Sequence, residues 1–490
     1  MDCAHRLYRA EQVRELDRQV IEHHGIAGYE LMKRAGRAAF RTLRARWPEA
    51  RRITVCCGGG NNAGDGYVIA CLARDARMEV QLVALKDPDE LVGDAARAAA
   101  DWRASGGVLA DPAGSLTGDV IVDALLGTGL DRPPAGAYAR LIERINESAH
   151  PVLAVDVPSG FNADTGIPLL PAVRADLTVT FIGNKRGLYT GQAGRWCGQR
   201  LYFDLDTPRA IHETLRADAW LLDAVNLPVC LRPRPPDTHK GDLGHVLVVG
   251  GDAGMAGAPV LAGRAALRTG SGLVTLATRS GHAAAALAVQ PELMCRATET
   301  SEALDGFIES ADVIGLGPGL GQSDWSRVVW QRALSADLPL VVDADGLNLL
   351  AKANRSLDLS RAILTPHPGE AARLLDCSAA EVQSDRFAAV RALAERYGAV
   401  VALKGHGTLV SEPEGRVAVC PYGNPAMASA GMGDALTGII ASLVGQGLEP
   451  FTAACCGVLL HALAGDRAAA GRRQILATDL IDRLADVLPA

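Results

Sequence analysis

The chain lacks the features that direct a protein to nucleic acid, into a membrane or out of the cell. Its 490 residues carry a net charge of −7 and no run of lysine or arginine, which disfavours a polyanionic partner. The N-terminal segment has no continuous apolar region of the kind found in a signal peptide. The longest uncharged stretches are shorter than the ~20 apolar residues of a membrane helix. We therefore expect a cytoplasmic protein that binds neither nucleic acid nor membrane.

Disulfide, metal and nucleotide signatures are also missing. The eleven cysteines are scattered and include no Cys-x-x-Cys, which disfavours a disulfide framework and a structural zinc site. Most of them are expected to be small buried side chains. The chain contains no G-x-x-x-x-G-K-[ST] signature and no G-x-G-x-x-G fingerprint. These absences argue against a P-loop nucleotide site and against a nicotinamide dehydrogenase.

Short apolar runs alternate with alanine-rich stretches, a rhythm typical of a parallel sheet flanked by helices. A helix is predicted near Glu11–Ile21, with Val13, Leu16 and Val20 on one face. Five nearly continuous apolar runs predict strands that are buried on both faces. They lie in the segments RITVCCGGG, EVQLVAL, DVIVDALLG, PVLAVDVPSG and LTVTFIG. The first half is therefore predicted to be a Rossmann-like domain.

The length of the chain predicts two domains. The proline-rich stretch RPRPPDTHK at 232–240 forbids regular structure and places a boundary in or before it. The strand pattern then restarts in GHVLVVGGDAG, GLVTLAT, DVIGLGPGLG, PLVVDADGLN, AILTPHPGE and AVVALKGHGT. We predict a Rossmann-like parallel-sheet domain at 1–213 and a second α/β domain at 214–490.

Polar residues follow three predicted strands of the first domain, at the ends where α/β sheets bind their ligands. Asn62, Asp123 and Ser159 could supply hard oxygen ligands to a monovalent or alkaline-earth cation. Asp156 then remains as a candidate proton carrier. A single aspartate at a strand end can equally cap a helix or form a turn, and this alternative stays open for Asp123.

The segment NPAMASAGMGDALTGII places small residues and two glycines directly before an apolar helix. A helix start presents unpaired N–H groups and the positive end of the helix dipole, so its amides could hold a phosphate. Asp434 would then act beside that phosphate as a general base for an attacking hydroxyl. The pattern predicts phosphoryl transfer, and it resembles the anion hole of the ribokinase-like fold. Taken alone, it could also be an ordinary aspartate in a first helical turn.

Four motifs of the first domain, NNAGDG, VDALLGTG, VDVPSG and TFIGNKRGLYTGQAG, resemble the epimerase domain of bifunctional NAD(P)H-hydrate repair enzymes. The resemblance implies a potassium ion held by Asn62, Asp123 and Ser159. Lys185 is a further candidate for acid–base work, and a solvated loop lysine is the alternative. The resemblance implies that the hydrate is bound by Asn61, Asn62, Ala63, Gly64, Asp65, Gly127, Thr128, Gly129, Leu130, Asp131, Arg132, Pro133 and Asp156.

Six ordered motifs of the second domain, among them VIGLGPGLG, VVDADGLNLL, ILTPHPGE and VALKGHGTLV, resemble the ADP-dependent dehydratase of the same family, which has the ribokinase-like fold. The resemblance implies that Ala258, Gly319, His367 and Asp434 contact the hydrate. It implies that the nucleotide is bound by Lys404, Gly405, His406, Gly407, Thr408 and Gly433. Mg²⁺ is expected beside ADP, and Asp343 and Asp345 could orient phosphates or a metal, or could cap the next helix.

By this resemblance the chain repairs hydrated NADH and NADPH, written NADHX and NADPHX. The first domain would interconvert the R and S hydrates, and the second would dehydrate the S hydrate with ADP, giving AMP, phosphate and NAD(P)H. One alternative is a ribokinase-like vitamin or sugar kinase fused to a nucleotide-binding module. Another is a non-catalytic N-terminal half. We expect a homo-oligomer.

Two positions depart from the pattern of the family. Ala63 stands where glycine is usual, and if this position required a positive φ, alanine would cost ~1–2 kcal/mol. Met432 stands where threonine is usual. Because the amides that hold a phosphate belong to the backbone, the loss of this hydroxyl is expected to reduce nucleotide affinity or rate rather than abolish binding.

Overall fold

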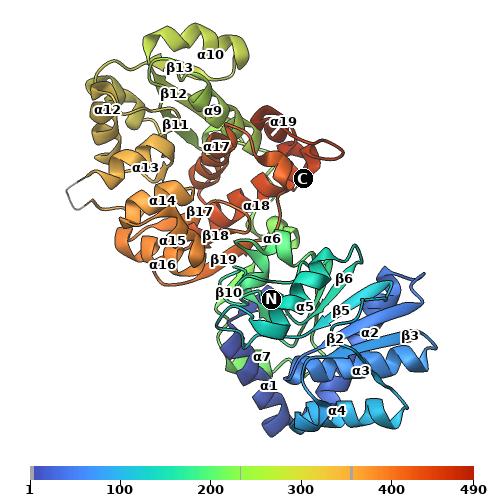
Figure 1. The fold of residues 1–490 in the computed structure, drawn as a ribbon. Coiled ribbons are helices and arrows are strands. Elements are labelled where there is room, and N and C mark those ends of the chain that lie inside the picture. Colours follow the sequence, from blue (N-terminus) through green and yellow to red (C-terminus); the bar gives the residue numbers. More distant parts are fainter. Residues whose placement is uncertain (1–4, 232, 354–356, 490) are drawn as a thin grey trace. The chain divides into compact units, whose positions relative to one another are not determined.

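The computed structural model describes residues 5–231, 233–353 and 357–489. The chain divides into two compact units, Met1–Trp220 and Leu221–Ala490 (Figure 1). The division lies before the proline-rich stretch, whose residue 232 is outside the described residues. The domain limits 1–213 and 214–490 stay predictions. No helix of the described residues is long and apolar enough to cross a membrane.

The first unit is built on a parallel sheet in the order β4-β3-β2-β5-β6-β7-β9. The five predicted strands are all present in it, which confirms the Rossmann-like layout. The strands are β2 (Arg52–Cys57), β3 (Glu79–Ala84), β4 (Leu109–Ala110), β5 (Val120–Ala124), β6 (Val152–Val155), β7 (Leu177–Phe181) and β9 (Gln199–Phe203). A smaller group pairs β1 (Arg6–Tyr8) with β8 (Asn184–Lys185) and with β10 (Ala219–Leu221).

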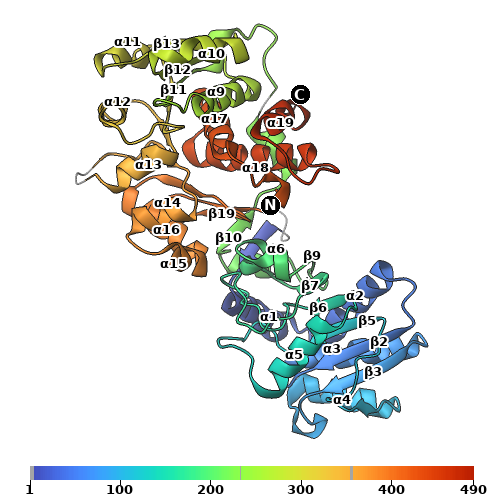
Figure 2. The ribbon, with the colours of Figure 1, turned by 45° about the horizontal axis from the view of Figure 1, so that its top comes forward.

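Helices cover both faces of this sheet, so its strands β5, β6 and β7 are buried along their whole length (Figures 1 and 2). Adjacent side chains of a strand point to opposite faces, and accordingly Cys57 packs with one group of helices while Cys56 packs with α5 on the other face. The first group is α1 (Ala10–His24), α2 (Gly28–Arg46), α3 (Asn61–Asp75) and α4 (Gly93–Ala104), and α5 spans Gly136–Glu147. The short helices are α6 (Ala193–Trp196) and α7 (Ile211–Thr214).

The second unit has a sheet in the order β13-β12-β11-β14-β15-β16-β17-β18-β19. It is parallel through β17, and the hairpins to β18 and β19 are antiparallel. The loop from β17 to β18 is too short for a parallel crossover, which explains this change of direction. The strands are β11 (His245–Val249), β12 (Leu273–Thr278), β13 (Met294–Ala297), β14 (Val313–Leu316), β15 (Leu340–Val342), β16 (Ala362–Leu364), β17 (Val400–Leu403), β18 (Thr408–Ser411) and β19 (Val417–Cys420).

The core of the second unit lies around α17 (Met432–Gly445), which packs against α9 (Gly257–Thr269) and α18 (Pro450–Ala468). A Cβ atom at Gly438 would lie 1.9 Å from the carbonyl oxygen of Ala262, so only glycine permits this approach of α9 and α17. The remaining helices are α8 (Leu227–Cys230), α10 (Ala283–Val289), α11 (Asp305–Ile308), α12 (Asp324–Leu334), α13 (Ala344–Ala351), α14 (Pro368–Leu375), α15 (Ala379–Ser384), α16 (Arg386–Tyr397) and α19 (Ala477–Asp482).

Each sheet contains one point where the order of its strands reverses. In the first unit the chain runs outward from β2 to β3 and β4, and then from β5 in the opposite direction. In the second unit the same reversal separates β11 from β14. Ligands of open α/β sheets bind outside the carboxyl ends of the strands at such a point. The loops that follow these four strands are therefore the places to search for functional sites.

Candidate active sites

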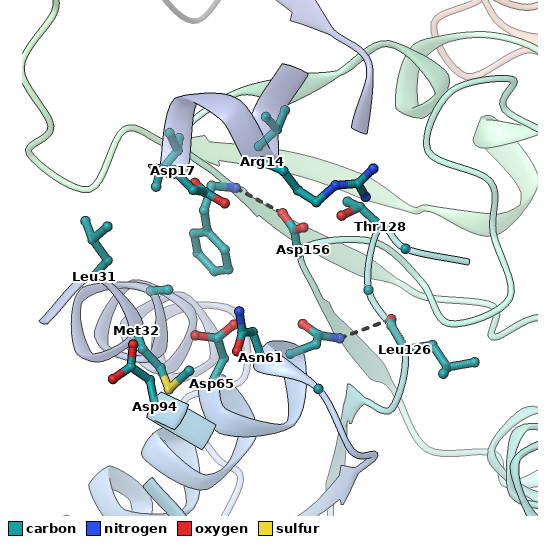
Figure 3. A pocket seen from close by; sticks show the side chains of 18 of the residues that line it. Arg14, Asp17, Leu31, Met32, Asn61, Asp65, Asp94, Leu126, Thr128 and Asp156 are labelled. Atoms are coloured by element: carbon teal, nitrogen blue, oxygen red, sulfur yellow. Dashed lines mark hydrogen bonds between the residues drawn. The ribbon is translucent and has the colours of Figure 1, made fainter. Parts of the chain in front are cut away.

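The first unit contains a pocket of about 590 Å³ at its strand reversal (Figure 3). The loops after β2, β5 and β6 form one side of it, and helices α1 and α2 contribute another. The residues predicted from the sequence that line it are Asn61, Asn62, Asp65, Gly127, Thr128, Gly129, Leu130, Asp156 and Lys185. Those that do not line it are Ala63 and Gly64, which are buried in α3, Asp123 and Ser159, which are also buried, and Asp131, Arg132 and Pro133, which are exposed.

The glycine-rich loop after β2 lets two strand ends approach one another. A Cβ atom at Gly58 would lie 1.9 Å from the carbonyl oxygen of Leu125, so a side chain there would separate β2 from β5. The loop then turns directly into α3, whose first residues are Asn61 and Asn62. Ala63 lies in this first helical turn and is absent from the residues with positive φ. Alanine therefore brings no backbone strain to a position where glycine is usual.

Asn62, Asp123 and Ser159 lie close together, as the sequence predicted. Ser159 donates to the Asp123 carboxylate from its Oγ (2.6 Å) and its N–H (2.7 Å). Asn62 Nδ2 donates to Leu126 O (3.1 Å), and the Leu126 N–H donates to Ser159 Oγ (2.8 Å). Burial raises the pKa of Asp123 to about 6, although the bonds from Ser159 oppose this shift. Asp123 caps no described helix, but its Oδ1 also accepts from the Leu125 N–H (3.3 Å). The side chain therefore supports the turn after β5 and also belongs to this cluster.

One oxygen of the cluster has no partner. Asn62 Oδ1 is buried and accepts no hydrogen bond from any described residue. A buried amide oxygen normally has a donor, because leaving it unpaired costs about 1–3 kcal/mol. The Nδ2 of the same side chain shares the acceptor Leu126 O with Ser159 Oγ, which in turn donates to the Asp123 carboxylate. This is the arrangement expected of a site that binds a cation through oxygen ligands.

Asp156 follows β6 in a left-handed conformation, with φ of 67°. Non-glycine residues adopt this region rarely, and they cluster at functional sites when they do. Its Oδ1 accepts hydrogen bonds from Thr180 Oγ1 (3.0 Å), from the Phe181 N–H (3.3 Å) and from Lys185 Nζ. Its Oδ2 accepts none from the residues that the structure describes. One oxygen thus holds the side chain in place while the other remains available to a ligand.

Lys185 is buried, with 1% of its side chain exposed, and it pairs with Asp156. The alternative of a solvated loop lysine is therefore wrong. The sequence signal for burial was weak, because Lys185 lies in the two-residue strand β8, which is too short to produce an apolar pattern. Its ammonium also donates to Thr180 Oγ1 and to Phe181 O, both at 3.0 Å.

Three charged residues of the pocket were not predicted from the sequence: Arg14 and Asp17 on α1, and Asp94 on α4. Figure 3 shows Arg14 and Asp17 on the helix that lies beside Asp156, with Asp65 on the opposite side of the pocket. Burial raises the pKa of Asp65 well above its ordinary value, and the negative charges of Asp156 and Asp17 add to this shift. The pocket therefore concentrates carboxyl groups.

In the second unit, the predicted apolar helix is α17, which begins at Met432 behind Gly431 in a left-handed conformation with φ of 86°. No side chain caps this helix, so its first amides remain open to a ligand. The Met432 side chain is buried in the core, which explains why a long apolar residue is tolerated at the helix start. Burial raises the pKa of Asp434 to about 7, the charge of Asp343 adds to the shift, and Lys404 opposes it.

A buried ion pair lies beside this helix start. Lys404 Nζ donates to Asp343 Oδ1 (2.6 Å), and Thr437 Oγ1 donates to Asp343 Oδ2 (2.9 Å). Burial is the largest single influence and favours the neutral forms, but the charge attraction and the hydrogen bonds together outweigh it. The pKa of Asp343 is therefore lowered and that of Lys404 is raised. A Cβ atom at Gly433 would lie 3.2 Å from both Asp343 Oδ2 and Lys404 Nζ. The positive charge therefore adjoins the open amides.

His367 and Glu370 form a capping box at the start of α14. His367 Nδ1 accepts from the Gly369 N–H (2.9 Å), and Glu370 Oε2 accepts from the His367 N–H (2.8 Å). Lys404 Nζ lies 3.8 Å from Glu370 Oε2, so this carboxyl also adjoins the ion pair. Burial raises the pKa of Glu370 to about 7, and Lys404 opposes the shift. Burial and the charge of Lys404 lower the pKa of His367.

The two loops at the strand reversal of the second unit contact one another. Asp252 N–H donates to Gly319 O (2.8 Å), and a Cβ atom at Gly319 would lie 3.0 Å from Ala258 Cβ. Asp345 Oδ2 accepts from the Gly321 N–H (2.9 Å), so Asp345 supports the second loop. Asp343 occupies the N-cap position of α13 without capping it. The capping alternative therefore fails for Asp343.

The predicted nucleotide loop leaves β17 at Lys404 and enters β18 at Thr408. Gly405 and Gly407 have φ of 136° and 62°, and Thr408 Oγ1 donates to Gly405 O (3.0 Å). Arg386 Nη2 donates to Lys404 O (3.2 Å) from below the loop. The loop is thus a tight, glycine-dependent turn.

His461 on α18 contacts the first residue of α17. Its Nε2 lies 3.0 Å from Met432 O, a geometry in which a neutral imidazole donates to the carbonyl. Burial lowers the pKa of His461 to about 4. This residue was not predicted, because a single histidine in an apolar helix resembles an ordinary core residue.

The chain matches two family models, one in each unit. Residues 28–187 match the family model of the YjeF-related protein N-terminus, and residues 246–486 match that of NAD(P)H-hydrate dehydratase. The chain is 48% identical over 482 residues to the bifunctional NAD(P)H-hydrate repair enzyme of Coxiella burnetii, with 98% of each chain covered. It is 44% identical to the enzyme of the same name from Escherichia coli, covering 98% of this chain and 93% of that protein.

Solved structures resemble the chain over about half of its length. A ribokinase-like superfamily protein from Enterococcus faecalis has a TM-score of 0.52 and 29% identity, and covers 55% of this chain and 94% of its own. A hypothetical protein from Streptococcus mutans has the same TM-score and 28% identity, and covers 55% of this chain and all of its own. The predicted ribokinase-like fold is thereby confirmed. With relatives aligned over nearly its whole length, the chain belongs to the family of bifunctional NAD(P)H-hydrate repair enzymes.

Proposed function

We propose that the two units divide the repair of hydrated NADH and NADPH between the two sites described above. The first site interconverts the R and S hydrates, and the second dehydrates the S hydrate at the expense of ADP, giving AMP, phosphate and NAD(P)H. The limits 1–213 and 214–490 are proposed for the two domains. The observation that supports this division best is Asp434, a half-buried carboxyl beside open helix amides and the half-buried Lys404.

Dehydration requires a better leaving group than hydroxide. The hydroxyl of the hydrate lies on the carbon next to the ring nitrogen. We infer that Asp434 takes its proton while the oxygen attacks the terminal phosphorus of ADP, so that an O–P bond forms and AMP leaves. The nitrogen lone pair then expels phosphate, and loss of a proton from the neighbouring carbon restores the double bond. A pKa of about 7 suits Asp434 to this task, because it can accept a proton near neutral pH.

The helix start would hold the phosphate. The amides of Met432 and Gly433 supply donors, and Lys404 supplies charge beside them. The loop 404–408 would bind the nucleotide, and Ala258, Gly319 and His367 the hydrate. Asp343 and Asp345 are both engaged by protein donors, so a Mg²⁺ ion would be bound by the ADP phosphates and water rather than by these side chains.

Epimerisation requires only that a bond between the ring nitrogen and the carbon bearing the hydroxyl breaks and forms again. Asp156 is the proposed base, because its Oδ2 is directed at no described donor while Oδ1 is held by three. The residues of 61–65 and 127–133 would bind the hydrate around it. Potassium fits the cluster of Asn62, Asp123 and Ser159, since Asn62 Oδ1 is buried without a partner. When bound, such an ion supplies positive charge near the anionic substrate.

The test uses the full-length protein with purified S-NADHX, ADP and Mg²⁺. Recovery of NADH absorbance supports repair, whereas a stable phosphorylated product indicates a vitamin or sugar kinase. The variant Asp434→Asn should lose about 10²–10⁴-fold in rate while leaving epimerisation of the R hydrate intact. The variant Asp156→Asn should slow epimerisation of the R hydrate and leave dehydration of the S hydrate intact. Asparagine tolerates the left-handed backbone at this position. If either variant retains the parental rate, the corresponding assignment is wrong.

A further inference from the structure

Helix α1 presents a polar edge to the pocket of the first unit. Val13, Leu16 and Val20 are buried in the core. Arg14, Asp17 and Ile21, spaced three and four residues apart, line the pocket on the neighbouring side of the helix. Figure 3 shows Asp17 on the same side of the pocket as Asp156. The helix therefore brings a second carboxyl group to the proposed epimerase site, from a part of the chain that precedes both matched family regions.

Lys185 cannot supply the second proton of an epimerisation. An ammonium group has three N–H donors. Those of Lys185 are directed at Asp156 Oδ1, Thr180 Oγ1 and Phe181 O, and the side chain is 1% exposed. A group that donates a proton to the substrate must be able to reach it, and each donor of Lys185 already has a protein partner. Lys185 therefore positions Asp156.

Asp17 differs from Lys185 in this respect. Its carboxyl group lines the pocket and forms no hydrogen bond or ion pair with any described residue. Burial raises its pKa to about 6, the charge of Asp156 adds to the shift, and Lys185 opposes it. A carboxyl with such a pKa can both give and take a proton near neutral pH.

We propose that Asp17 is the second proton carrier of the epimerase site and acts on the ring nitrogen of the hydrate while Asp156 acts on the hydroxyl. The inference rests on the proposed epimerase function. Asp156 takes the hydroxyl proton, the carbon–nitrogen bond breaks with its electron pair on nitrogen, and Asp17 gives its proton to that nitrogen. The product is an open-chain aldehyde. After rotation about the neighbouring carbon–carbon bond, nitrogen attacks the other face, its proton returns to Asp17, and the proton on Asp156 goes to oxygen.

Two neighbouring groups are less suited to this role. Arg14 cannot release a proton in proteins. Figure 3 shows Asp65 on the opposite side of the pocket from Asp156. Burial raises the pKa of Asp65 well above its ordinary value, which favours a role as a hydrogen-bond donor. The titratable or charged groups that line the pocket with Asp17 are Arg14, Asp65, Asp94, Tyr138, Asp156 and Lys185.

The experiment compares full-length wild type with Asp17→Asn. Pure R-NADHX is incubated without nucleotide, and the two hydrates are separated by chromatography. We expect Asp17→Asn to slow epimerisation about 10²–10³-fold. Dehydration of the S hydrate with ADP should be unchanged, because that site lies in the other unit. Glu11→Gln is the matched control, since it removes an exposed carboxylate from the same helix and should leave both rates unchanged.

The dependence on pH separates a chemical role from a structural one. Because Asp17 must begin protonated, kcat/KM of the wild type should fall as pH rises through about 6. This fall should be absent from the residual rate of Asp17→Asn and should persist in Asp17→Glu, which also serves if the asparagine variant does not fold. The inference is overturned if Asp17→Asn epimerises at the parental rate, or if its profile keeps the fall. If the wild type itself does not interconvert the hydrates, the proposed epimerase function fails instead.

Discussion

Replacing Lys404 by methionine should destabilise the second unit strongly, because it leaves a buried carboxylate without its counter-ion. Asp343 is 1% exposed, and it would lose the 2.6 Å bond from Lys404 while keeping the 2.9 Å bond from Thr437. Removing one partner of a buried ion pair typically costs about 3–5 kcal/mol of stability. We therefore expect Lys404→Met to lower the unfolding free energy of this unit by that amount at pH 8.

The measurement is calorimetric or urea-induced unfolding of the full chain, with the transition of the second unit followed separately, since a two-domain protein need not unfold in one step. Arg327→Met is the matched control. It breaks the pair of Arg327 with Asp324, whose side chains are 58% and 97% exposed, and such surface pairs contribute little. The double variant Asp343→Asn/Lys404→Met should regain part of the loss, because no unpaired charge remains.

The sign of the pH dependence follows from the lowered pKa of Asp343. A depressed carboxyl pKa contributes stability above its ordinary value, and this contribution disappears as pH falls through the folded-state pKa. In Lys404→Met, protonation of Asp343 removes the buried charge, so the defect should shrink as pH is lowered. A loss as small as that of Arg327→Met, or a defect that grows in acid, would refute this account of the pair.

Three further outcomes are expected. Asp434 must be ionised to accept a proton, and burial raises its pKa to about 7. The value of kcat/KM for dehydration should therefore rise with pH through about 7 and then level off. A flat profile from pH 5 to 9 would count against the role of Asp434. Gly433→Ala should raise KM for ADP, because the new methyl group lies 3.2 Å from Lys404 Nζ at the helix start. It should not lower the unfolding temperature, because alanine favours a helix more than glycine does. Asn62→Leu should abolish any stabilisation of the first unit by K⁺ relative to a large organic cation, as measured by thermal unfolding; persistence of that effect would remove Asn62 from the cation site.

The parallel sheets could be predicted from the sequence because their strands are buried on both faces and read as continuous apolar runs. The ends of the strands could also be located, because each apolar run stops at a polar residue. Such a residue lies at the edge of the sheet where ligands bind. Asn62, Asp123 and Ser159 were brought together from separate segments on this basis, and the structure places them around one loop. The two-residue strand β8 gave no such signal, and Lys185 was left undecided.

Other residues of the candidate sites depend on contacts that the spacing of residues along the sequence does not reveal. Asp17 lies next to buried positions of α1 and could be taken for an ordinary surface carboxyl, because its environment is created by strand ends that are distant in sequence. Glu370 was overlooked beside His367, although a glutamate three positions after a capping residue forms a recognisable capping box. The segment 131–133 was predicted from resemblance alone, and in this structure it is exposed outside the pocket.

The hydrogen bond of His461 with the first carbonyl of α17 has a consequence for catalysis across pH. Its imidazole takes up a proton only near pH 4, about three pH units below Asp434. Between those values Asp434 takes up a proton, as does Glu370 beside Lys404, while His461 stays neutral and keeps its bond to the Met432 carbonyl. Acidification should therefore protonate Asp434 and stop dehydration at a pH well above the one at which His461 is protonated. Because the bond that supports the helix start is still intact there, activity should return in full when neutral pH is restored.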